Sequence, residues 1–525
     1  MSKQTPNTIL YIGIAIAIGI LIGSMFDYPS NPSPLFTSNN QEKKIKRLIN
    51  YIQYDYVDEV DTDSLLDGAI NQMLLKLDPH SVYIPKSELQ GIQENMNGNF
   101  KGIGIQFRMI RDSVTVLNII KGGPSEKAGL LAGDRILLAD ADTIYGKRYT
   151  SDQIMGRLKG KDTNKVALTI YRKQNDSLLN FNFNRGNVNI TSIPIYYMIN
   201  KSIGFIKIDR FARNTYDEFH TALLALKADG MQTLILDLRG NTGGFMDIAN
   251  EIVDEFLPKD KLIVFTKNKA GKITNSIATQ KGDFETGTLY VLIDENSASA
   301  SEIVAGALQD NDQGTIVGRR SFGKGLVQQE MELGDGSAVR LTTARYYTPT
   351  GRSIQKPYEH NQNKTYFNDQ MNRIHNGELL NKDSIPINDT LKYTTPKGKI
   401  VYGGGGIVPD VFVPIDTTAY FPAYQIGRIT NFVFDYIDKD RKKYATMSWK
   451  EFEQSFDKTK IYNAYFSITN TPIKQNHTNK KVVQTYLKAL AARELFDETG
   501  FYRVYESQDK MLQKVLEIED TFAQQ

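Results

Sequence analysis

The sequence predicts a multidomain α/β protein, with a β-rich domain, a core that contains βαβ units, and helical regions at both ends. Its 525 residues exceed the usual length of one domain. From Ser202 onward, apolar strand-like runs alternate with amphipathic helical runs, which is typical of a buried parallel sheet. Residues 100–185 instead show short β-rich runs that are separated by glycine turns. A composition of 40% hydrophobic and 23% charged residues can fill several cores.

Shifts in composition and periodicity divide the chain further. We expect, in chain order, a cytoplasmic N-terminus (1–8), a transmembrane anchor (9–26), a linker (27–41), an N-terminal helical region (42–98), the β-rich domain (99–186), the βαβ core (187–417) and a C-terminal helical extension (418–525). Within the core, residues 357–400 form an insert rich in Asn and Lys, which we expect to be a surface excursion.

Charge and cysteine content exclude several functions. The net charge is only +3, from 63 basic and 60 acidic residues, so there is no electrostatic case for a nucleic-acid partner. The chain has no cysteine, which excludes thiol catalysis, disulfides, thiolate metal sites and a lipoprotein anchor.

Residues 9–25 carry no charge and are long enough to cross a bilayer. Lys3 precedes them, and no further Lys or Arg occurs before Lys43. The positive-inside rule therefore leaves the N-terminus in the cytoplasm and the rest of the chain outside, facing the periplasm or another extracytoplasmic space. A cleaved signal peptide is the alternative, but residues 23–26 contain no small-x-small cleavage site, which favours an uncleaved anchor.

Ser299 is a candidate nucleophile. It lies between a buried strand and an amphipathic helix, near the helix N-terminus, where backbone N–H groups lack intrahelical partners. A nucleophile there has an oxyanion donor in the amide of Ala300. An ordinary N-cap serine is the alternative. Because Ser297 and Ser301 alternate with Ser299, the local pattern alone does not select one of the three.

A serine nucleophile needs a base, and Lys324 is the candidate. It lies between Gly323 and Gly325 in an apolar setting, and desolvation lowers the pKa of a lysine toward the range that a base requires. If residues 324–328 form a strand, Gln328 shares a face with Lys324 and holds its amine in position. The alternative is a solvated lysine on a turn.

A glycine-rich turn follows the buried strand that ends at Leu238. Residues 239–244 expose backbone N–H groups that can bind an anion. One interpretation is an oxyanion hole in which the amide of Gly243 or Gly244 acts together with that of Ala300. The other is a phosphate loop, but the turn lacks the lysine and the glycine spacing of known phosphate-binding motifs.

Three motifs occur in one order: LDLRGNTGG, then SASASEIVAGALQD, then SFGKGLVQ. Together they resemble the carboxyl-terminal processing (tail-specific) serine peptidases over about residues 43–416. The resemblance implies a crotonase- or Clp-like peptidase core, and it requires no metal or cofactor. It assigns the nucleophile to Ser299, the general base to Lys324, the orienting role to Gln328, and the oxyanion hole to the amides of Ala300 and the Gly243–Gly244 turn.

Asp310 matches an aspartate that is sometimes treated as functional in that family. It lies eleven residues after Ser299, about 16 Å along a helix axis, so we expect a structural role.

Residues 99–186 resemble a PDZ domain. Gly102, Ile103, Gly104 and Ile105 correspond to a carboxylate-binding loop that leads into a strand, whose edge pairs with a peptide tail. Ordinary turn glycines are the alternative, but residues 122–137 carry a second PDZ signature. Lys159 lies where some relatives carry an arginine that links this domain to the active site, and lysine cannot make the same bidentate contacts.

The resulting hypothesis is a Ser–Lys endopeptidase that processes extracytoplasmic proteins near their C-termini. Its partners are polypeptides with free C-terminal tails and the membrane; relatives suggest a homodimer, and an adaptor protein is left open. The alternatives are a catalytically silent PDZ adaptor and a β-lactam-binding hydrolase. The latter lacks the SxxK spacing around Ser299.

Overall fold

The computed structural model describes residues 39–160, 164–279, 282–359, 363–417, 423–469 and 480–523. The predicted anchor (9–26), the N-terminus before it and most of the linker lie outside these residues. Within the described ranges, no helix is long and apolar enough to cross a membrane. The chain divides into two units, Met1–Ile70 and Asn71–Gln525.

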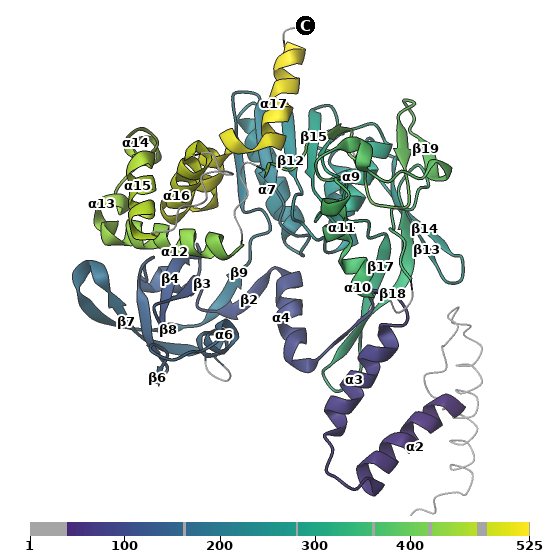
Figure 1. Cartoon of the computed structure of the whole chain (residues 1–525), viewed down its shortest axis with the longest axis horizontal. Helices are drawn as coiled ribbons and strands as arrows, with labels where there is room; N and C mark the ends of the chain where they lie inside the picture. The colour runs from purple at the N-terminus through teal and green to yellow at the C-terminus, as the bar shows by residue number, and fades with distance from the viewer. Residues whose placement is uncertain are drawn as a thin grey trace, which may run out of the picture. The chain divides into compact units, whose positions relative to one another are not determined.

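The first unit contains α2 (Asn40–Asp55) and the beginning of α3 (Thr62–Leu74) (Figure 1). Helix α2 starts at a capping box: the Asn39 side chain accepts from the N–H of Glu42 at 3.0 Å, and the Glu42 carboxylate accepts from the N–H of Asn39 at 3.1 Å.

The predicted N-terminal helical region continues in the second unit, where it also contains a short strand. Its elements there are β1 (Val82–Ile84) and α4 (Lys86–Asn97).

The core of the second unit is a six-stranded sheet in the order β10-β11-β12-β15-β16-β21, parallel except for β10. Its strands are β10 (Ile195–Met198), β11 (Ile203–Lys207), β12 (Thr233–Asp237), β15 (Thr288–Ile293), β16 (Thr315–Gly318) and β21 (Val411–Phe412). The predicted alternation of strands and helices is confirmed. Because the strands are parallel, the loops that follow β12 and β15 meet at one edge of the sheet.

Helices cover both faces of this sheet (Figure 1). They are α7 (Thr215–Ala228), α8 (Met246–Asp254) and α9 (Ala300–Asp310) on one face and α17 (Lys510–Ala523) on the other. Successive side chains of a strand point to opposite faces. In β12, Leu234 and Leu236 therefore join the core under α7, α8 and α9, whereas Ile235 packs with Met511 and Leu512 of α17.

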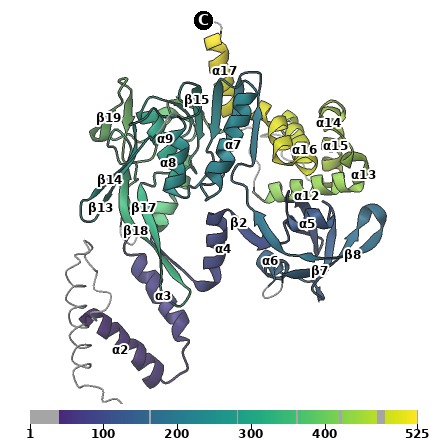
Figure 2. The ribbon, with the colours of Figure 1, turned by 180° about the vertical axis from the view of Figure 1, so that it is seen from behind.

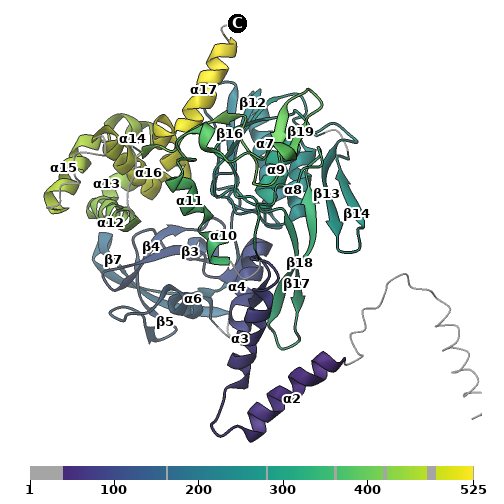
Figure 3. The same cartoon turned by 45° about the vertical axis from the view of Figure 1, so that its right-hand side comes forward.

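A second sheet, in the order β1-β18-β13-β14 with β17 paired to β18, packs against the same helices (Figure 3). Its strands are β13 (Leu262–Asn268), β14 (Ile273–Ile277), β17 (Leu326–Glu332) and β18 (Ala338–Tyr347), together with β1. Strand β17 begins two residues after Lys324 and so fixes one side of the candidate site.

The β-rich domain is built on the sheet β3-β4-β5-β7-β8, with β6 paired to β5 and a separate β2-β9 ribbon. Its elements are β2 (Asn99–Gly102), β3 (Ile105–Ile110), β4 (Ser113–Ile119), α5 (Pro124–Ala128), β5 (Arg135–Ala139), β6 (Asp142–Thr143), α6 (Ser151–Lys159), β7 (Lys165–Arg172), η1 (Lys173–Asn175), β8 (Ser177–Asn184) and β9 (Gly186–Asn189). Among the described residues, β3 pairs only with β4, so its other edge is open to an added strand.

The predicted C-terminal helical extension is confirmed. It comprises α12 (Ala423–Lys439), α13 (Arg441–Ala445), α14 (Trp449–Ser455), α15 (Lys458–Thr469), α16 (Lys480–Tyr505), η5 (Glu506–Gln508) and α17. Helices α12 to α16 share an apolar core of their own. They lie against the β-rich domain (Figure 2), where Asp438 Oδ2 and Arg135 Nη2 are 2.6 Å apart.

The insert at 357–400 is not simply a surface excursion, because Tyr366 and Arg373 are buried. It contains α10 (Asn363–Phe367), α11 (Asp369–His375), η2 (Lys382–Ser384), η3 (Asp389–Leu391) and β19 (Lys392–Thr394), which pairs with β20 (Ile400–Tyr402). Arg373 Nη1 donates to the carbonyls of Arg320 and Ser321 at 3.0 and 2.9 Å. A buried guanidinium needs such acceptors, so the insert supports the segment that leads to Lys324.

Candidate active site

Ser299 occupies the N-cap position of α9 with an unusual backbone. Its φ is 55° and its ψ is −113°, whereas an N-cap residue ordinarily has β-region dihedrals. A serine at positive φ is strained and persists only where its surroundings hold it. The N–H of Ser299 donates to Glu302 Oε2 at 2.9 Å, and the Tyr346 hydroxyl lies 3.1 Å from the Ser299 carbonyl oxygen. Ser299 is therefore not an ordinary N-cap serine.

The structure separates Ser299 from its two neighbouring serines. Ser297 Oγ donates to the Leu238 carbonyl at 2.8 Å, and Ser301 Oγ donates to the Asn241 carbonyl at 2.9 Å. Both of these residues are buried, whereas Ser299 lines a cavity. The hydroxyls of Ser297 and Ser301 thus hold the backbone of the turn after β12, which leaves Ser299 as the candidate nucleophile.

Lys324 lines the same cavity as Ser299. Burial lowers the pKa of its amine to about 8; the charge of Arg340 also lowers this pKa, whereas Glu302 and Asp78 act to raise it. The Nζ donates to Gln328 Oε1 at 2.8 Å. With this pKa, a substantial fraction of the amine is neutral in mildly alkaline solution, as a general base requires. The alternative of a solvated lysine does not fit this environment.

Gln328 reaches Lys324 although the two residues do not share a strand. Strand β17 begins at Leu326, and its register against β18 shifts between Val327 and Gln328. Gln328 Nε2 also donates to the His80 carbonyl. His80 is held in turn by Asp78, whose Oδ1 accepts from the His80 N–H at 2.9 Å. Burial lowers the pKa of the His80 ring to about 3, so this ring stays neutral beside Lys324.

Glu302 connects Ser299 to the Lys324 segment, and sequence reasoning did not nominate it. Its Oε2 accepts from the N–H groups of Ser299 and Lys324 at 2.9 and 2.8 Å. Its Oε1 accepts from Ser321 Oγ at 2.5 Å and from the Gly323 N–H at 2.7 Å. Burial raises the pKa of this fully enclosed carboxyl, and the four hydrogen bonds act against that rise. The S-x-x-E spacing of a capping box was the available signal.

We expect Glu302→Gln to lower the free energy of unfolding by about 3 kcal/mol, because it breaks a buried charged hydrogen-bond network. Each carboxylate oxygen of Glu302 accepts two hydrogen bonds. Whichever way the glutamine amide turns, its NH₂ group replaces one of these oxygens and faces two donors without an acceptor for them. Urea unfolding measures the change. Glu330→Gln is the control, since Glu330 is exposed and its Oε2 lies 3.2 Å from Arg340 Nη2. Equal stability of the two variants would contradict this role of Glu302.

The turn after β12 lies directly against Ser299. A Cβ atom on Gly243 would lie 2.8 Å from the Ser299 Cβ, and one on Gly244 would lie 2.2 Å from the Phe211 carbonyl oxygen. The Gly243 N–H donates to Asn241 Oδ1 at 2.8 Å. Among the described residues, the N–H groups of Gly244 and Ala300 have no hydrogen-bond partner. Of the two glycine amides considered from the sequence, the one that remains available is that of Gly244.

The cavity that contains Ser299 and Lys324 has a volume of about 530 Å³. Gly243, Gly244, Ala300 and Gln328 also line it. Apolar side chains surround these polar groups: Ile92, Met96, Phe245, Met246, Ile303 and Leu326. A nucleophile, a base with a lowered pKa and free backbone amides thus share one pocket, which is the arrangement that acyl transfer needs.

Comparisons with known proteins agree with this chemistry. The model of peptidase family S41 matches residues 202–360, and that of the PDZ domain matches residues 102–183. The "activating protease CtpB N-terminal domain" matches residues 27–88, and a family of unknown function matches residues 420–497. A carboxy-terminal-processing protease of Bartonella bacilliformis is 36% identical over 330 residues, which cover 61% of this chain and 75% of that protein.

The chain belongs to peptidase family S41. It is a carboxy-terminal processing serine protease, a hydrolase. The carboxy-terminal processing protease CtpB of Bacillus subtilis is 32% identical over 367 residues, 68% of this chain and 75% of that protein. The solved structure of a photosystem II D1 C-terminal processing protease is 24% identical in sequence, and the match covers 72% of this chain and 89% of that protein. Its TM-score of 0.37 is too low to add to the assignment.

The PDZ domain of this S41 protease has a second cavity, of about 740 Å³. The residues predicted for peptide binding, Gly102, Ile103, Gly104 and Ile105, all line it. Gly104 has a φ of 80°, a conformation that glycine adopts without strain. The cavity lies along the open edge of β3, where an extended peptide can add as a strand.

Lys159 joins the PDZ domain to α4. Its Nζ contacts Glu94 Oε2, and it lies 5.2 Å from the centroid of the Phe100 ring. Helix α4 borders both cavities, since Glu94 lines the PDZ cavity and Met96 lines that of Ser299. The sequence placed Lys159 between the two sites, and the structure gives it a single ion pair there rather than a bidentate contact.

Asp310 lies apart from the Ser–Lys pair. It is buried, its Oδ1 is 2.7 Å from Arg352 Nη2, and its Oδ2 accepts from Thr350 Oγ1 at 2.7 Å. These contacts fix the C-terminal end of α9, in agreement with the structural role expected from its distance along the helix.

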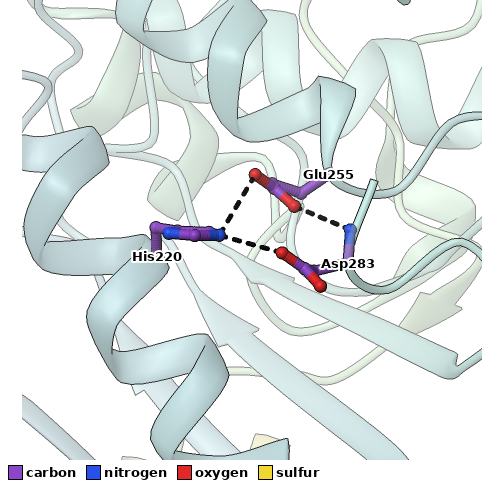
Figure 4. Close-up of side chains that lie close together, drawn as sticks. All are labelled: His220, Glu255 and Asp283. Atoms are coloured by element: carbon purple, nitrogen blue, oxygen red, sulfur yellow. Dashed lines mark hydrogen bonds and ion pairs between the residues drawn. The ribbon is translucent and has the colours of Figure 1, made fainter. Parts of the chain in front are cut away.

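Within the described residues, one group could hold a metal ion: His220, Glu255 and Asp283, whose ligand atoms lie within 4.8 Å of one another (Figure 4). Protein groups already engage all three. Asp283 Oδ2 is 2.9 Å from His220 Nε2, Asp283 Oδ1 is 2.9 Å from Lys227 Nζ, and Glu255 Oε1 accepts from the Tyr216 hydroxyl at 2.6 Å. None of these residues lines the cavity of Ser299, so the Ser–Lys chemistry does not involve them.

Proposed function

We propose that this S41 protease cleaves extracytoplasmic polypeptides near their C-termini, with Ser299 as nucleophile and Lys324 as general base. The observation that carries this proposal is the shared cavity, in which Lys324 is buried enough to have a pKa of about 8 beside the strained Ser299. The extracytoplasmic location rests on the uncharged segment 9–25 and the distribution of lysines around it.

The reaction follows from these groups. Neutral Lys324 accepts the hydroxyl proton of Ser299 while Oγ bonds to the scissile carbonyl carbon. The N–H groups of Gly244 and Ala300 donate to the negative oxygen that forms. The C–N bond then breaks, and the Lys324 ammonium gives its proton to the leaving amine. In the second half, Lys324 accepts a proton from water as the water oxygen bonds to the acyl carbon, and the Lys324 ammonium returns this proton to Ser299 Oγ when the ester C–O bond breaks. Gln328 holds the lysine amine throughout.

Substrate tails reach this site through the PDZ domain. The loop Gly102–Ile105 receives the terminal carboxylate, and the edge of β3 pairs with the preceding residues. Apolar side chains around Ser299 then receive the segment that is cut. Binding of the tail is separate from the chemistry, so a substrate without a free carboxylate loses affinity for the PDZ domain and not the ability to acylate Ser299.

The test uses the full chain in detergent and one unstructured polypeptide with an apolar C-terminus, prepared with a free carboxylate or with a terminal amide. We expect kcat/KM to be about 10-fold or more higher for the carboxylate form, since hydrogen bonds to a charged group contribute roughly 1.5–3 kcal/mol. Mass spectrometry of the fragments measures both rates, and Ser299→Ala provides the blank. Equal rates would remove tail recognition from the proposal, whereas no cleavage of either form by the wild type would overturn the proposed function itself.

A further inference from the structure

The glycine turn beside Ser299 is tied to the C-terminal end of the chain by a partly buried ion pair. Arg239 is the second residue after β12 and opens this turn. Its Nη1 donates to Asp509 Oδ1 at 2.8 Å, and its Nη2 lies 2.7 Å from Asp509 Oδ2. The same guanidinium binds Asp237, the last residue of β12, through Nε at 2.8 Å and Nη2 at 2.7 Å. Two carboxylates therefore fix the orientation of one planar group.

Asp509 is itself held in place by α17. Its Oδ1 accepts from the N–H groups of Met511 and Leu512 at 3.1 and 3.2 Å, so it caps this helix. Met511 and Leu512 are buried against the central sheet. In Figure 1, α17 lies beside β12, the strand that leads to the turn. Asp509 is thus a rigid anchor rather than a mobile surface residue.

From Arg239, the backbone of the turn and the hydrogen bonds that it makes lead to the residues beside the nucleophile. The Arg239 carbonyl accepts from Lys207 Nζ at 2.9 Å. Two residues later, the Asn241 carbonyl accepts from the N–H of Ala298 at 3.0 Å and from Ser301 Oγ at 2.9 Å. The Asn241 side chain holds Gly243. Arg239 thus anchors the start of the turn, while Asn241 joins its middle to the residues on either side of Ser299.

We propose that Asp509 is a positioning residue for the hydrolytic reaction, which acts through Arg239 to place the Gly244 amide opposite Ala300. This inference rests on the proposed function, in which that amide stabilises the oxyanion. Asp509 lies outside both the S41 match and the match to the family of unknown function, which end at residues 360 and 497. The last part of the C-terminal extension thereby gains a role in the chemistry of the core.

The matched variants are Asp509→Asn and Glu519→Gln in the full chain. Asparagine keeps an oxygen that caps α17 but loses the charge and one acceptor that Arg239 uses. Glu519 is also on α17 and also contacts β12, where its Oε2 accepts from Thr233 Oγ1 at 2.8 Å, and its Oε1 accepts from the Tyr290 hydroxyl at 2.8 Å. Because Thr233 begins β12 and Asp237 ends it, Glu519→Gln loosens the same packing away from the turn.

We expect Asp509→Asn to lower kcat by about 10-fold with KM within about twofold of the wild type, a fraction of the effect of deleting an oxyanion donor. A peptide aldehyde, whose adduct with Ser299 places an oxygen in the oxyanion hole, should lose affinity in parallel with kcat. Asp509→Glu should recover part of the rate. Glu519→Gln should keep the wild-type kcat.

Three results would overturn the proposal. The first is an unchanged kcat for Asp509→Asn, the second is an equal loss of kcat in Glu519→Gln, and the third is a rise in the KM of Asp509→Asn in place of a lower kcat. Each would show that the Arg239–Asp509 contact serves folding or substrate binding and does not position the turn. If Ser299→Ala cleaved like the wild type, the proposed function would fail first, and the role of Asp509 with it. Cleavage that depends on Ser299 but not on Asp509 would overturn only this inference.

Discussion

Ser299→Ala is expected to lower kcat/KM by about 10⁶-fold, the magnitude typical of removing the nucleophile from a serine protease. The reason is local: the variant keeps the cavity, the Lys324 amine and the free N–H groups, but no oxygen remains to form the acyl-enzyme. Stability should change by no more than about 0.5 kcal/mol, because alanine has the same strain as serine at positive φ and no packing is lost. Peptide hydrolysis and thermal unfolding measure the two quantities.

The same variant decides among the three alternating serines. A fluorophosphonate that modifies activated serines should label the wild type and Ser297→Ala, but not Ser299→Ala. Ser297→Ala is a fair control because the Ser297 hydroxyl is buried and bonded to the Leu238 carbonyl, so its loss affects folding more than reactivity. Persistent labelling of Ser299→Ala would place the nucleophile elsewhere and would invalidate the Ser–Lys mechanism as written.

Much of the fold was predictable because its signals are local. In the core, each buried strand is a short apolar run, and each helix that covers the sheet has a clear apolar stripe, so β12, β15, α7 and α9 could be placed from periodicity. Ser299 and the glycine turn could be placed as well, since both follow buried strands in a parallel sheet and such ends converge. The candidate pair itself came from the resemblance, as a lone lysine between glycines is by physical criteria more often solvated.

The remaining site residues could not be predicted, because their meaning depends on partners far along the chain. Glu302 reads as an ordinary acidic residue in the first turn of a helix until Ser321 and Gly323 are seen beside it. Asp509 reads as a helix cap, and nothing local connects it to Arg239, 270 residues earlier. The insert at 357–400 misled for the same reason: its polarity suggested exposure, yet Arg373 is buried because backbone carbonyls of the core satisfy it.

The second large effect is expected from Lys324→Met, which should abolish hydrolysis and at the same time stabilise the protein. The activity should fall by about 10⁴-fold or more, because the Ser299 hydroxyl loses its base. In the wild type, kcat/KM should rise with pH and level off above an apparent pKa of about 8, since only the neutral amine accepts a proton. The variant should show no such pH dependence in its residual rate.

The gain in stability follows from the direction of the pKa shift. The folded protein lowers the pKa of Lys324 from 10.5 to about 8, so the folded state binds the proton more weakly than the unfolded chain does. Below pH 8 both states are protonated, and the shift destabilises the fold by roughly 3 kcal/mol. As pH rises from 8 to 10.5, this loss disappears. Lys324→Met removes this destabilisation but also removes the hydrogen bond to Gln328. We therefore expect the free energy of unfolding to rise by about 1–2 kcal/mol at pH 7, and this gain to disappear by pH 10.

Lys356→Met is the matched control for the predicted gain in stability of Lys324→Met. Burial also lowers the pKa of Lys356, but its Nζ has an ionic partner in Asp369 at 3.2 Å and a hydrogen bond to the Tyr366 carbonyl at 3.1 Å. Removing it leaves the Tyr366 carbonyl without this donor and leaves Asp369 with Arg373, whose Nε is 3.0 Å from Asp369 Oδ2, so the control should lose stability by about 1–3 kcal/mol. Urea unfolding at pH 7 and pH 10 compares the three proteins. If Lys324→Met were destabilised like Lys356→Met, then Lys324 would be a structural cation, and its lowered pKa would not reflect a base kept neutral for catalysis.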